Sequence, residues 1–247
     1  MFGGWRWIIY NECIIMTAKK TKGKLIVIDG IDGSGKSTQV DLLFKRLKKE
    51  RYKVKKIDFP RYYDNFFGEF IGQCLRDKSY NWLNVHPKIA STIYACDRFE
   101  STKEINKWLE EGFIVIANRY VASNQIHQGS KIKNQKDRQD FMNWLDKMEH
   151  QILGIPRPDV IFYLSLPINL VLEMLKKRDL DEKRNYLKKK KDVHEESIDF
   201  LINSRKSAMK LLKEKKNFIK IDCSLLGKLL AREEIAEIIF NKVKNNI

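Results

Sequence analysis

The chain has 247 residues, enough for one sizeable hydrophobic core, and 43% of them are hydrophobic, which excludes a disordered chain. Membrane spanning is excluded as well, because no apolar run reaches the length of about 18 residues that a transmembrane helix needs. The net charge of +16 favours anionic partners such as nucleotides, nucleic acid or a membrane surface, without choosing among them.

Residues 1–20 form an N-terminal extension that we expect either to be disordered or to result from a mis-assigned start. Asn11 and Glu12 interrupt its apolar stretches and no small-residue cleavage site follows, so the segment is not typical of a signal peptide. Met16 stands just before the polar residues that precede the first strand, and we expect translation to start there. The four cysteines are scattered without a C-x-x-C pair, which disfavours a zinc site or a disulfide framework and favours a reducing cytoplasm.

Residues 21–247 are predicted to form a single α/β domain in which strands alternate with helices. Apolar runs predict strands at 25–28, 53–60, 113–118, 160–166 and 218–223. Strands separated by helices predict three layers, a parallel sheet with helices on both faces, and ligands of such sheets bind at the carboxyl ends of the strands. The helical stripes between the strands are Val40, Leu43, Phe44 and Leu47; Ile105, Trp108 and Leu109; Phe141, Trp144, Leu145 and Met148; and Val171, Met174 and Leu175.

Residues 30–37, called the phosphate loop below, match the pattern G-x-x-x-x-G-K-[ST] in full and lie between a strand and a helix, the context that this motif requires. Glycines let successive N–H groups converge on phosphate oxygens, and the helix adds its positive N-terminal end. Lys36 can reach the β- and γ-phosphates of a nucleoside triphosphate, and the Ser37 hydroxyl can bind Mg²⁺. The expected ATP-binding residues are Gly30, Asp32, Gly33, Ser34, Gly35, Lys36, Ser37 and Thr38.

Four further stretches lie at the ends of predicted strands: DFPRYYDNFFGEFIG (58–72), YACDRFE (94–100), VIANRYVASNQIHQG (115–129) and RPDVIFYLSLP (157–167). With the phosphate loop, in this order and spacing, they resemble the thymidylate kinase family. That family shows FPR after the second strand, an aromatic residue with an arginine four positions on, a DRY-S-x-x-x-x-Q-G segment and a PD-x-x-x-x-L strand. The resemblance covers about residue 24 to the C-terminus and implies a P-loop NTPase fold. It also implies Mg²⁺-dependent transfer of the γ-phosphoryl group of ATP to dTMP, giving dTDP and ADP for dTTP synthesis.

The resemblance further implies roles for individual side chains. Arg61 and Arg119 would hold the phosphate of dTMP, because a guanidinium matches phosphate oxygens in bidentate geometry. Tyr94 would stack on the thymine ring, Arg98 would donate to a base carbonyl, and Asp32 would accept a hydrogen bond from the sugar 3′-hydroxyl. The alternatives are core packing for the aromatic side chains and structural ion pairs for Arg61 and Arg119. The pocket would be completed by Phe59, Phe66, Tyr120, Ser123 and Gln128, the last as a contact to the base edge.

Family members supply one more arginine to the transferring group, either from the phosphate loop or from a mobile lid. The loop position here is Gly33, so we expect the lid at about 176–196 to supply it, with Arg184 preferred over Arg178. Such an arginine accelerates phosphoryl transfer by a factor of about 10³ to 10⁵. The lysine run at 188–191 is equally typical of a solvated charged segment.

Three positions depart from the family pattern. Asn118 stands where the Asp of DRY is usual, Ser165 replaces an Asp that often follows the YL of its strand, and Val193 occupies a position where a lid arginine is frequent. An amide still forms hydrogen bonds but carries no charge for a cation. We therefore expect Asn118 to be a weak Mg²⁺ ligand that lowers turnover or shifts metal dependence without abolishing activity.

Alternative functions are another deoxynucleotide or deoxynucleoside kinase on the same fold, a catalytically weak paralogue, and a P-loop ATPase that binds nucleic acid. The last is disfavoured because the chain lacks an obvious hhhhD[DE] strand end and spreads its basic residues widely. We expect a cytoplasmic homodimer, without membrane association and without nucleic acid as a partner. The apolar stripes at 141–148 and 89–96 are candidate contact faces of the dimer, and core packing is the alternative for both.

Overall fold

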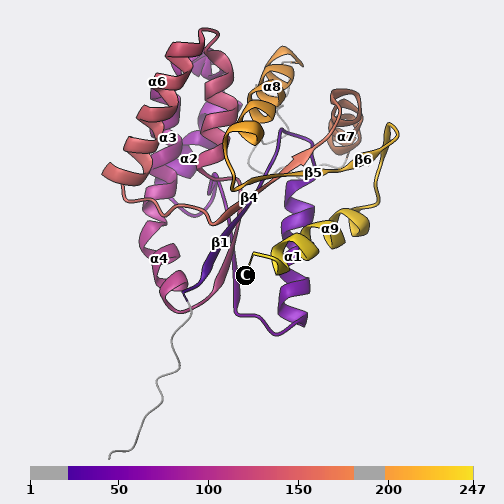
Figure 1. Ribbon diagram of the computed structural model, residues 1–247. Helices are drawn as coiled ribbons and strands as arrows, with labels where there is room; N and C mark the ends of the chain where they lie inside the picture. Colours follow the sequence, from indigo (N-terminus) through magenta and orange to yellow (C-terminus); the bar gives the residue numbers. More distant parts are fainter. Residues whose placement is uncertain (1–21, 181–197, 247) are drawn as a thin grey trace, which may run out of the picture.

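The apolar runs of the sequence form the central sheet in a computed structural model, which describes residues 22–180 and 198–246 (Figure 1). All strands of the sheet are parallel, in the order β2-β3-β1-β4-β5, and this confirms the predicted parallel sheet with helices on both faces. The strands are β1 (Lys24–Asp29), β2 (Val54–Asp58), β3 (Ile114–Asn118), β4 (Val160–Ser165) and β5 (Phe218–Asp222).

Strand β1 explains the three layers, because its side chains alternate between two hydrophobic cores. Ile26 and Ile28 belong to a core shared with α1, α7 and α9, whereas Leu25 and Val27 belong to a core shared with α3, α4 and α8. Figure 1 shows α1 and α9 on the opposite side of the sheet from α3 and α4. The bounds of these helices are α1 (Lys36–Lys49), α3 (Pro87–Glu100), α4 (Thr102–Glu110), α7 (Ile168–Leu180), α8 (Ile198–Glu214) and α9 (Arg232–Lys244).

Helices α2 (Phe66–Arg76) and α6 (Gln135–Asp146) lie further out, where α2 packs on α3 through a smaller core that includes Ile71 and Ala90. Two segments are π-helical, η3 (Asn124–Gln128) and η5 (Lys147–Ile152). Such wide turns are rare and are found frequently at functional sites. The remaining elements are η1 (Lys78–Tyr80), η2 (Trp82–Asn84), α5 (Val121–Ser123), η4 (Gly129–Lys131) and the hairpin of β6 (Ser224–Leu225) and β7 (Lys228–Leu229).

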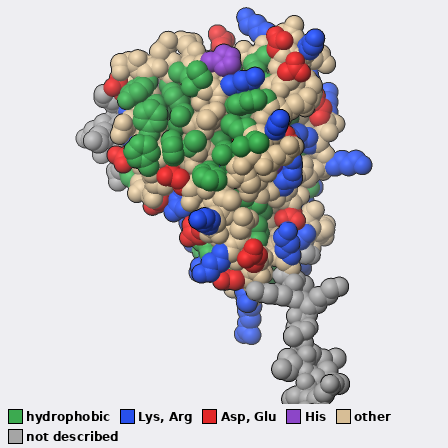
Figure 2. Space-filling view, turned by 90° about the vertical axis from the view of Figure 1, so that its left-hand side faces the viewer, with side chains coloured by type: hydrophobic (Ala, Val, Ile, Leu, Met, Phe, Trp, Pro, Cys, Tyr) green, Lys and Arg blue, Asp and Glu red, His purple; other side chains and the backbone are tan. Residues whose placement is uncertain are grey.

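An apolar surface covers the face of the molecule that carries α2, α3 and α6 (Figure 2). Phe66 is 72% exposed, Ile89 59% and Phe99 51%, and all three side chains belong to α2 or α3. Of the two stripes expected to pair with a second copy, the one at 89–96 contributes Ile89 to this surface. In the stripe at 141–148, Phe141 and Leu145 are buried in a core of their own. Among the residues described, no helix has the length and apolar character needed to span a membrane.

Candidate active site

The phosphate loop runs from the end of β1 into the first turn of α1. Gly33 and Gly35 have φ angles of 78° and 84°, in the left-handed region that glycine adopts without steric cost. Gly35 is the N-cap of α1, and among the described residues no side chain caps the helix and no acidic side chain lies in its first turn. The N–H groups of this turn are therefore available to an anion, and the dipole of the helix favours one.

Lys36 and Ser37 are anchored at this turn. The Nζ of Lys36 donates to the carbonyl oxygen of Ile31 at 2.9 Å, so the ammonium group lies back over the loop. The Ser37 hydroxyl accepts a hydrogen bond from Nδ2 of Asn118 at 3.2 Å, which joins the loop to the end of β3. Strand pairing explains this contact, since Ile28 and Asn118 are partners in the register of β1 and β3.

A cavity of about 580 Å³ lies at the carboxyl ends of the strands, where ligands of parallel sheets bind. It brings together most of the residues that the sequence predicts for the two substrates. These are Asp32, Gly33, Gly35, Lys36, Ser37, Thr38, Phe59, Tyr94, Arg98, Asn118, Arg119, Ser123 and Gln128. Among the described residues predicted for the two substrates, five do not line it, namely Gly30, Ser34, Arg61, Phe66 and Tyr120. The lining residues that sequence reasoning did not identify are Asp41, Lys56, Asp58, Pro60, Tyr62, Leu75, Asn124, His127 and Met174.

Arg119 holds an ion pair with Asp32 across the cavity, between the end of β3 and the phosphate loop. The backbone of Arg119 is left-handed, with φ at 63°, which is uncommon for a residue that carries a Cβ. Its Nη1 contacts Nε2 of His127 at 3.2 Å, and Nδ1 of His127 contacts Oγ of Ser204 at 3.1 Å. Because a guanidinium only donates, Nε2 accepts and the imidazole carries its proton on Nδ1. The arginine is thus held from two sides at the edge of the phosphate loop.

Tyr94, Arg98 and Gln128, which come from α3 and η3 and not from the phosphate loop, also line the cavity. The Tyr94 hydroxyl accepts from Nε1 of Trp82 at 3.1 Å, and the two rings meet edge to face. Arg98 forms a bidentate ion pair with the buried Glu149, with both N–O distances at 2.8 Å. Oε1 of Gln128 is buried and has no hydrogen-bond partner in the described part of the chain. A buried acceptor without a partner is costly, so this oxygen is suited to a donor on a ligand.

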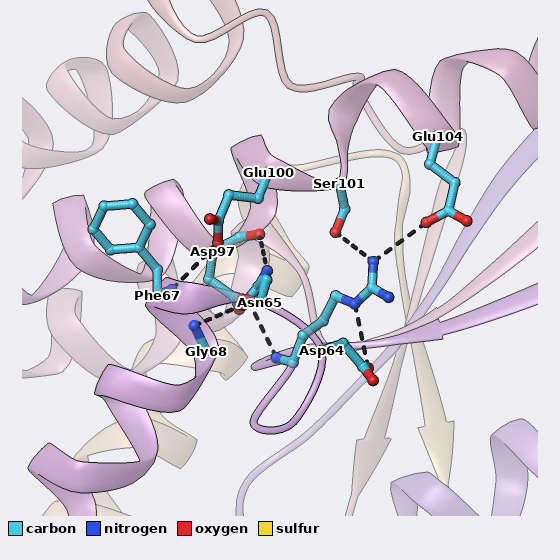
Figure 3. A network of polar contacts seen from close by, with 9 residues as sticks. Asp64, Asn65, Phe67, Gly68, Asp97, Glu100, Ser101 and Glu104 are labelled. Carbon is cyan, nitrogen blue, oxygen red and sulfur yellow. Dashed lines mark hydrogen bonds and ion pairs between the residues drawn. The ribbon is translucent and has the colours of Figure 1, made fainter.

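Arg61, for which the sequence predicts contact with the acceptor phosphate, does not line the cavity in this structure. Its Nη1 donates to Oγ of Ser101 at 2.9 Å and to Oε2 of Glu104 at 3.3 Å, where α3 meets α4. The loop is pinned in this direction because Oδ1 of Asp97 accepts from the Arg61 backbone N–H and from Asn65. Figure 3 shows Asn65 and Asp97 beside each other, with Ser101 and Glu104 further along, where α3 ends and α4 begins. The neighbouring residue Tyr62 lines the cavity instead.

Phe66 and Tyr120 are also placed differently from the prediction that they complete the pocket. Phe66 begins α2 and is exposed, in edge-to-face contact with Phe67. Tyr120 is fully buried in the core that covers the β1 face of Leu25 and Val27, and its ring packs against Phe59 at 5.7 Å. Core packing, the alternative that the sequence left open, applies to Tyr120.

Asp29, which sequence reasoning did not identify, closes β1 as a fully buried carboxylate. Burial raises its pKa, while Arg119 and Lys36 nearby act in the opposite direction. Its oxygens accept from the Gly30 N–H at 2.7 Å and from the Ser123 hydroxyl at 2.8 Å. Asp29 therefore links Gly30, at the start of the phosphate loop, to Ser123, which follows β3. The signal that could have revealed it is its place directly after a buried apolar run.

The residues present fit a divalent cation that is held mainly by substrate. In the described ranges no three His, Cys, Asp or Glu side chains cluster as a metal site. Asn118 is nevertheless close to Ser37, and its Oδ1 is buried without a hydrogen-bond partner in the same part of the chain. Mg²⁺ takes oxygen ligands and commonly binds through few protein groups together with phosphates and water.

Of the segment expected to act as a lid, residues 176–180 belong to the end of α7, whereas the rest, including Arg184 and Val193, lies outside the described residues, as does the side chain of Arg178. The N-terminal extension at 1–20 lies outside them as well. At the remaining departure from the family pattern, Ser165 ends β4 as a buried residue paired in register with Asp222.

Comparisons with known proteins agree on one family. A family model described as thymidylate kinase matches residues 28–235. Thymidylate kinases from Thermosipho africanus and Halothermothrix orenii are 32% and 30% identical to the chain, over stretches that cover 80% and 90% of this chain and 88% and 97% of the relatives. Among solved structures, the thymidylate kinase from Candida albicans matches with a TM-score of 0.67 at 21% identity, over 91% of this chain and 92% of that one. The structural likeness supports the three-layer fold.

Proposed function

Because the chain belongs to the thymidylate kinase family, we propose that the cavity at the carboxyl ends of its strands is where the reaction of this family takes place. The chain is an enzyme that transfers the γ-phosphoryl group of ATP to dTMP, giving dTDP and ADP. The observation that carries the assignment of the site is that one cavity is lined both by Lys36 and Ser37 of the phosphate loop and by Tyr94, Arg98 and Gln128. Donor and acceptor can therefore meet in a single space.

On the donor side, the phosphate loop and α1 hold ATP. The uncapped first turn of α1 supplies N–H groups to the phosphates, and Lys36 exchanges the carbonyl of Ile31 for their oxygens. Transfer passes through a loose transition state in which the protein positions the groups and neutralises charge, with little covalent chemistry of its own. Among the described residues, Lys36 is best placed to neutralise the negative charge of the transferring phosphoryl group.

On the acceptor side, Arg119 binds the phosphate of dTMP. The guanidinium already lies beside Asp32 at the edge of the phosphate loop, so an incoming phosphate finds it in place and competes with the carboxylate. Asp32, once relieved of part of this pair, accepts a hydrogen bond from the sugar 3′-hydroxyl. Tyr94 stacks on thymine, and Arg98 and Gln128 contact the edge of the base.

Mg²⁺ is the metal that we propose as cofactor. Ser37 would hold it together with phosphate oxygens and water, and the buried Oδ1 of Asn118 would lie next to it. When bound, the ion would neutralise charge on the phosphates of ATP. An amide at Asn118 adds no charge to this arrangement, so the cation would be neutralised less than by a carboxylate at the same position.

We further propose that residues 21–247 act as one kinase domain with a lid at about 176–196. Gly33 leaves the phosphate loop without an arginine, so the arginine on the transferring group comes from the lid, with Arg184 preferred over Arg178. The described cysteines Cys74, Cys96 and Cys223 are free thiols, which is in keeping with a cytoplasmic enzyme.

A homodimer is the assembly that we propose, with the apolar surface of α2 and α3 as the interface. Large apolar side chains that gather on one exposed face are typical of an interaction site, and a second copy of the chain presents the same face. Ile89 and Phe99 are the large hydrophobic side chains that α3 exposes on this surface.

The experiment that tests the function is a coupled assay of ADP formation with ATP and an acceptor panel of dTMP, dUMP, dCMP, dGMP and thymidine. We expect dTMP to be the preferred acceptor and Arg119→Ala to raise the KM for dTMP by at least about tenfold, because a charge-assisted contact is lost. Arg157→Ala is the matched control, since Arg157 forms a bidentate pair with Asp146 on the exterior. Preference for thymidine would show a nucleoside kinase, and DNA-stimulated hydrolysis of ATP without transfer to dTMP would overturn the assignment.

A further inference from the structure

Arg98 and Glu149 form the most deeply buried ion pair at the cavity. The two side chains are 2% and 0% exposed, and Nε and Nη2 of the arginine donate to the two carboxylate oxygens, each at 2.8 Å. Nη1 of Arg98 has no hydrogen-bond partner among the residues that the structure describes, and Arg98 lines the cavity. One edge of the guanidinium is therefore taken by Glu149, and the remaining nitrogen is left for a ligand.

Glu149 also holds a second group that lines the cavity. Its Oε1 accepts from Nδ2 of Asn124 at 2.8 Å, and the same nitrogen donates to the carbonyl of Ser91 at 3.1 Å. Asn124 begins the π-helical turn η3, which ends at Gln128, whose buried Oε1 lacks a partner in the described ranges. One carboxylate thus orients Arg98 and the segment that carries Gln128.

A wide turn places this carboxylate behind the arginine. Glu149 lies in the π-helical turn η5, where the Leu153 N–H donates to the carbonyl of Met148 and the Ile155 N–H donates to the carbonyl of Glu149. Glu149 is not among the residues that line the cavity, so it acts on a ligand only through its neighbours. Glu149 therefore orients Arg98 without lining the cavity, whereas Arg98 lines it and can contact a ligand.

We propose that Glu149 is a positioning residue that sets which pyrimidine the site accepts, by holding Arg98 with Nη1 toward the base. The inference rests on the proposed function, in which Arg98 donates to a base carbonyl. A guanidinium offers donors only, so it suits the 4-carbonyl of thymine and opposes the 4-amino group of cytosine. Without the Glu149 carboxylate, the Arg98 guanidinium can turn to other acceptors. Its Nη1 then no longer faces the 4-amino group of cytosine, and cytosine is rejected less strongly.

Glu149→Gln tests the proposal, because it keeps the shape of the side chain and removes its charge. We expect the KM for dTMP to rise about 10- to 100-fold, the loss that accompanies one charge-assisted hydrogen bond. The kcat at saturating dTMP and the KM for ATP should stay within about twofold of the wild type. The ratio of the Ki of dCMP to the KM for dTMP should fall, and a merely structural role would not move this ratio.

Asp146→Asn is the matched control, since Asp146 holds Arg157 in an equally bidentate pair at the exterior, three residues before Glu149. It should change none of these constants. If Glu149→Gln does not fold, the double variant Arg98→Met and Glu149→Gln removes both buried charges and keeps an oxygen for Asn124. Its ratio of dCMP Ki to dTMP KM should equal that of Arg98→Met alone, because Glu149 acts through Arg98.

Two results would overturn the proposal. The first is a folded Glu149→Gln enzyme with an unchanged KM for dTMP and an unchanged ratio of dCMP Ki to dTMP KM. The second is a double variant whose ratio falls below that of Arg98→Met. A wild-type enzyme that does not phosphorylate dTMP would instead refute the proposed function, so the two failures are distinguishable.

Discussion

Asn118 is the residue at which the chain departs most clearly from the chemistry expected of its position. Its side chain joins β3 to the phosphate loop through Ser37, and its Oδ1 is buried without a partner in the described part of the chain. A carboxylate in the same place could take the same hydrogen bond in reverse and add a negative charge. The amide therefore keeps the geometry of the position while leaving a nearby cation less well neutralised.

The first prediction concerns Asn118→Asp. We expect the Mg²⁺ concentration for half-maximal activity to fall several-fold and kcat to rise, because a carboxylate is a better ligand for a hard cation than an amide. The measurement is a Mg²⁺ titration of the rate at saturating ATP and dTMP. Asn143→Asp, an exposed amide on α6, is the control for added charge. The idea fails if Asn118→Asp leaves both the rate and the Mg²⁺ requirement unchanged.

Lys131 gives a prediction about pH. Burial lowers its pKa from 10.5 to about 8, and its Nζ donates to the carbonyl of Val85 at 3.3 Å. Between pH 8 and pH 10.5 the unfolded chain binds a proton that the folded chain lacks, so this lysine makes stability rise with pH across that window. Below pH 8, Lys131 is protonated in the folded protein, which then carries the full cost of a half-buried charge.

We therefore expect Lys131→Met to raise the free energy of unfolding by about 1 to 2 kcal/mol at pH 7, with the gain shrinking as pH rises through this window. Urea titrations of both proteins at several pH values measure the difference. Lys88→Met is the control for loss of one charge, because Lys88 is exposed and lines, together with Lys131, a second hollow separate from the active-site cavity. A difference that stays constant with pH would show that Lys131 is not the group responsible.

The phosphate loop packs closely against α7 at Gly33, a contact that leaves little room for any side chain at this position. A Cβ at Gly33 would lie 2.9 Å from Cγ of Leu175 and 3.2 Å from the carbonyl oxygen of Val171. Any side chain at position 33 therefore displaces α7, in addition to the strain of the left-handed backbone. In the proposal made above, the arginine therefore comes from the segment at about 176–196, whose first residues belong to the end of α7.

Gly33→Ala should lower the free energy of unfolding by about 2 to 3 kcal/mol, the sum of backbone strain and overpacking. Gly154→Ala is a matched control, because Gly154 has a φ of 64° but no atom near its Cβ, so only the strain of about 1 kcal/mol remains. In a Leu175→Ala background, Gly33→Ala should cost less than in the wild type. Equal costs in both backgrounds, measured by urea unfolding, would contradict the contact.

The strands and the phosphate loop could be predicted from the sequence, whereas the positions of two site residues could not. The strands follow from apolar runs and the phosphate loop from a long, specific motif, so both could be predicted. Arg61 could not be placed, because its direction depends on Asp97 and Ser101, which lie far along the chain and meet it only in the fold. Glu149 carries no motif at all, since its role arises from a wide turn that brings it behind Arg98.

For the whole molecule, the order of the strands determines where chemistry can occur. Strand β1 is central and both of its neighbours are parallel to it, so the ends of β1 and β3 place the phosphate loop beside Asn118 and Arg119. The apolar surface of α2 and α3 lies on the flank of the sheet that also carries Tyr94 and Arg98. Association of two copies would therefore cover the outer face of α3, the helix that carries two of the residues we propose as contacts to the base.

Ile89→Lys combined with Phe99→Lys should convert the dimer into a monomer, because two charges would have to be buried at the interface. Sedimentation velocity measures the mass directly. Leu226→Lys is the control, since Leu226 is 94% exposed in the hairpin of β6 and β7, away from α3. A wild-type protein that sediments as a monomer at micromolar concentration would contradict the proposed assembly.

The parallel arrangement of the sheet also offers a place for attachment. Because every strand runs in the same direction, the turns that precede the strands gather at the edge away from the cavity, about 17 Å from it for strands of this length. Arg51 and Tyr52, in the turn before β2, are exposed at that edge. A fluorophore or surface tether joined there would report on the enzyme while leaving both substrates unobstructed.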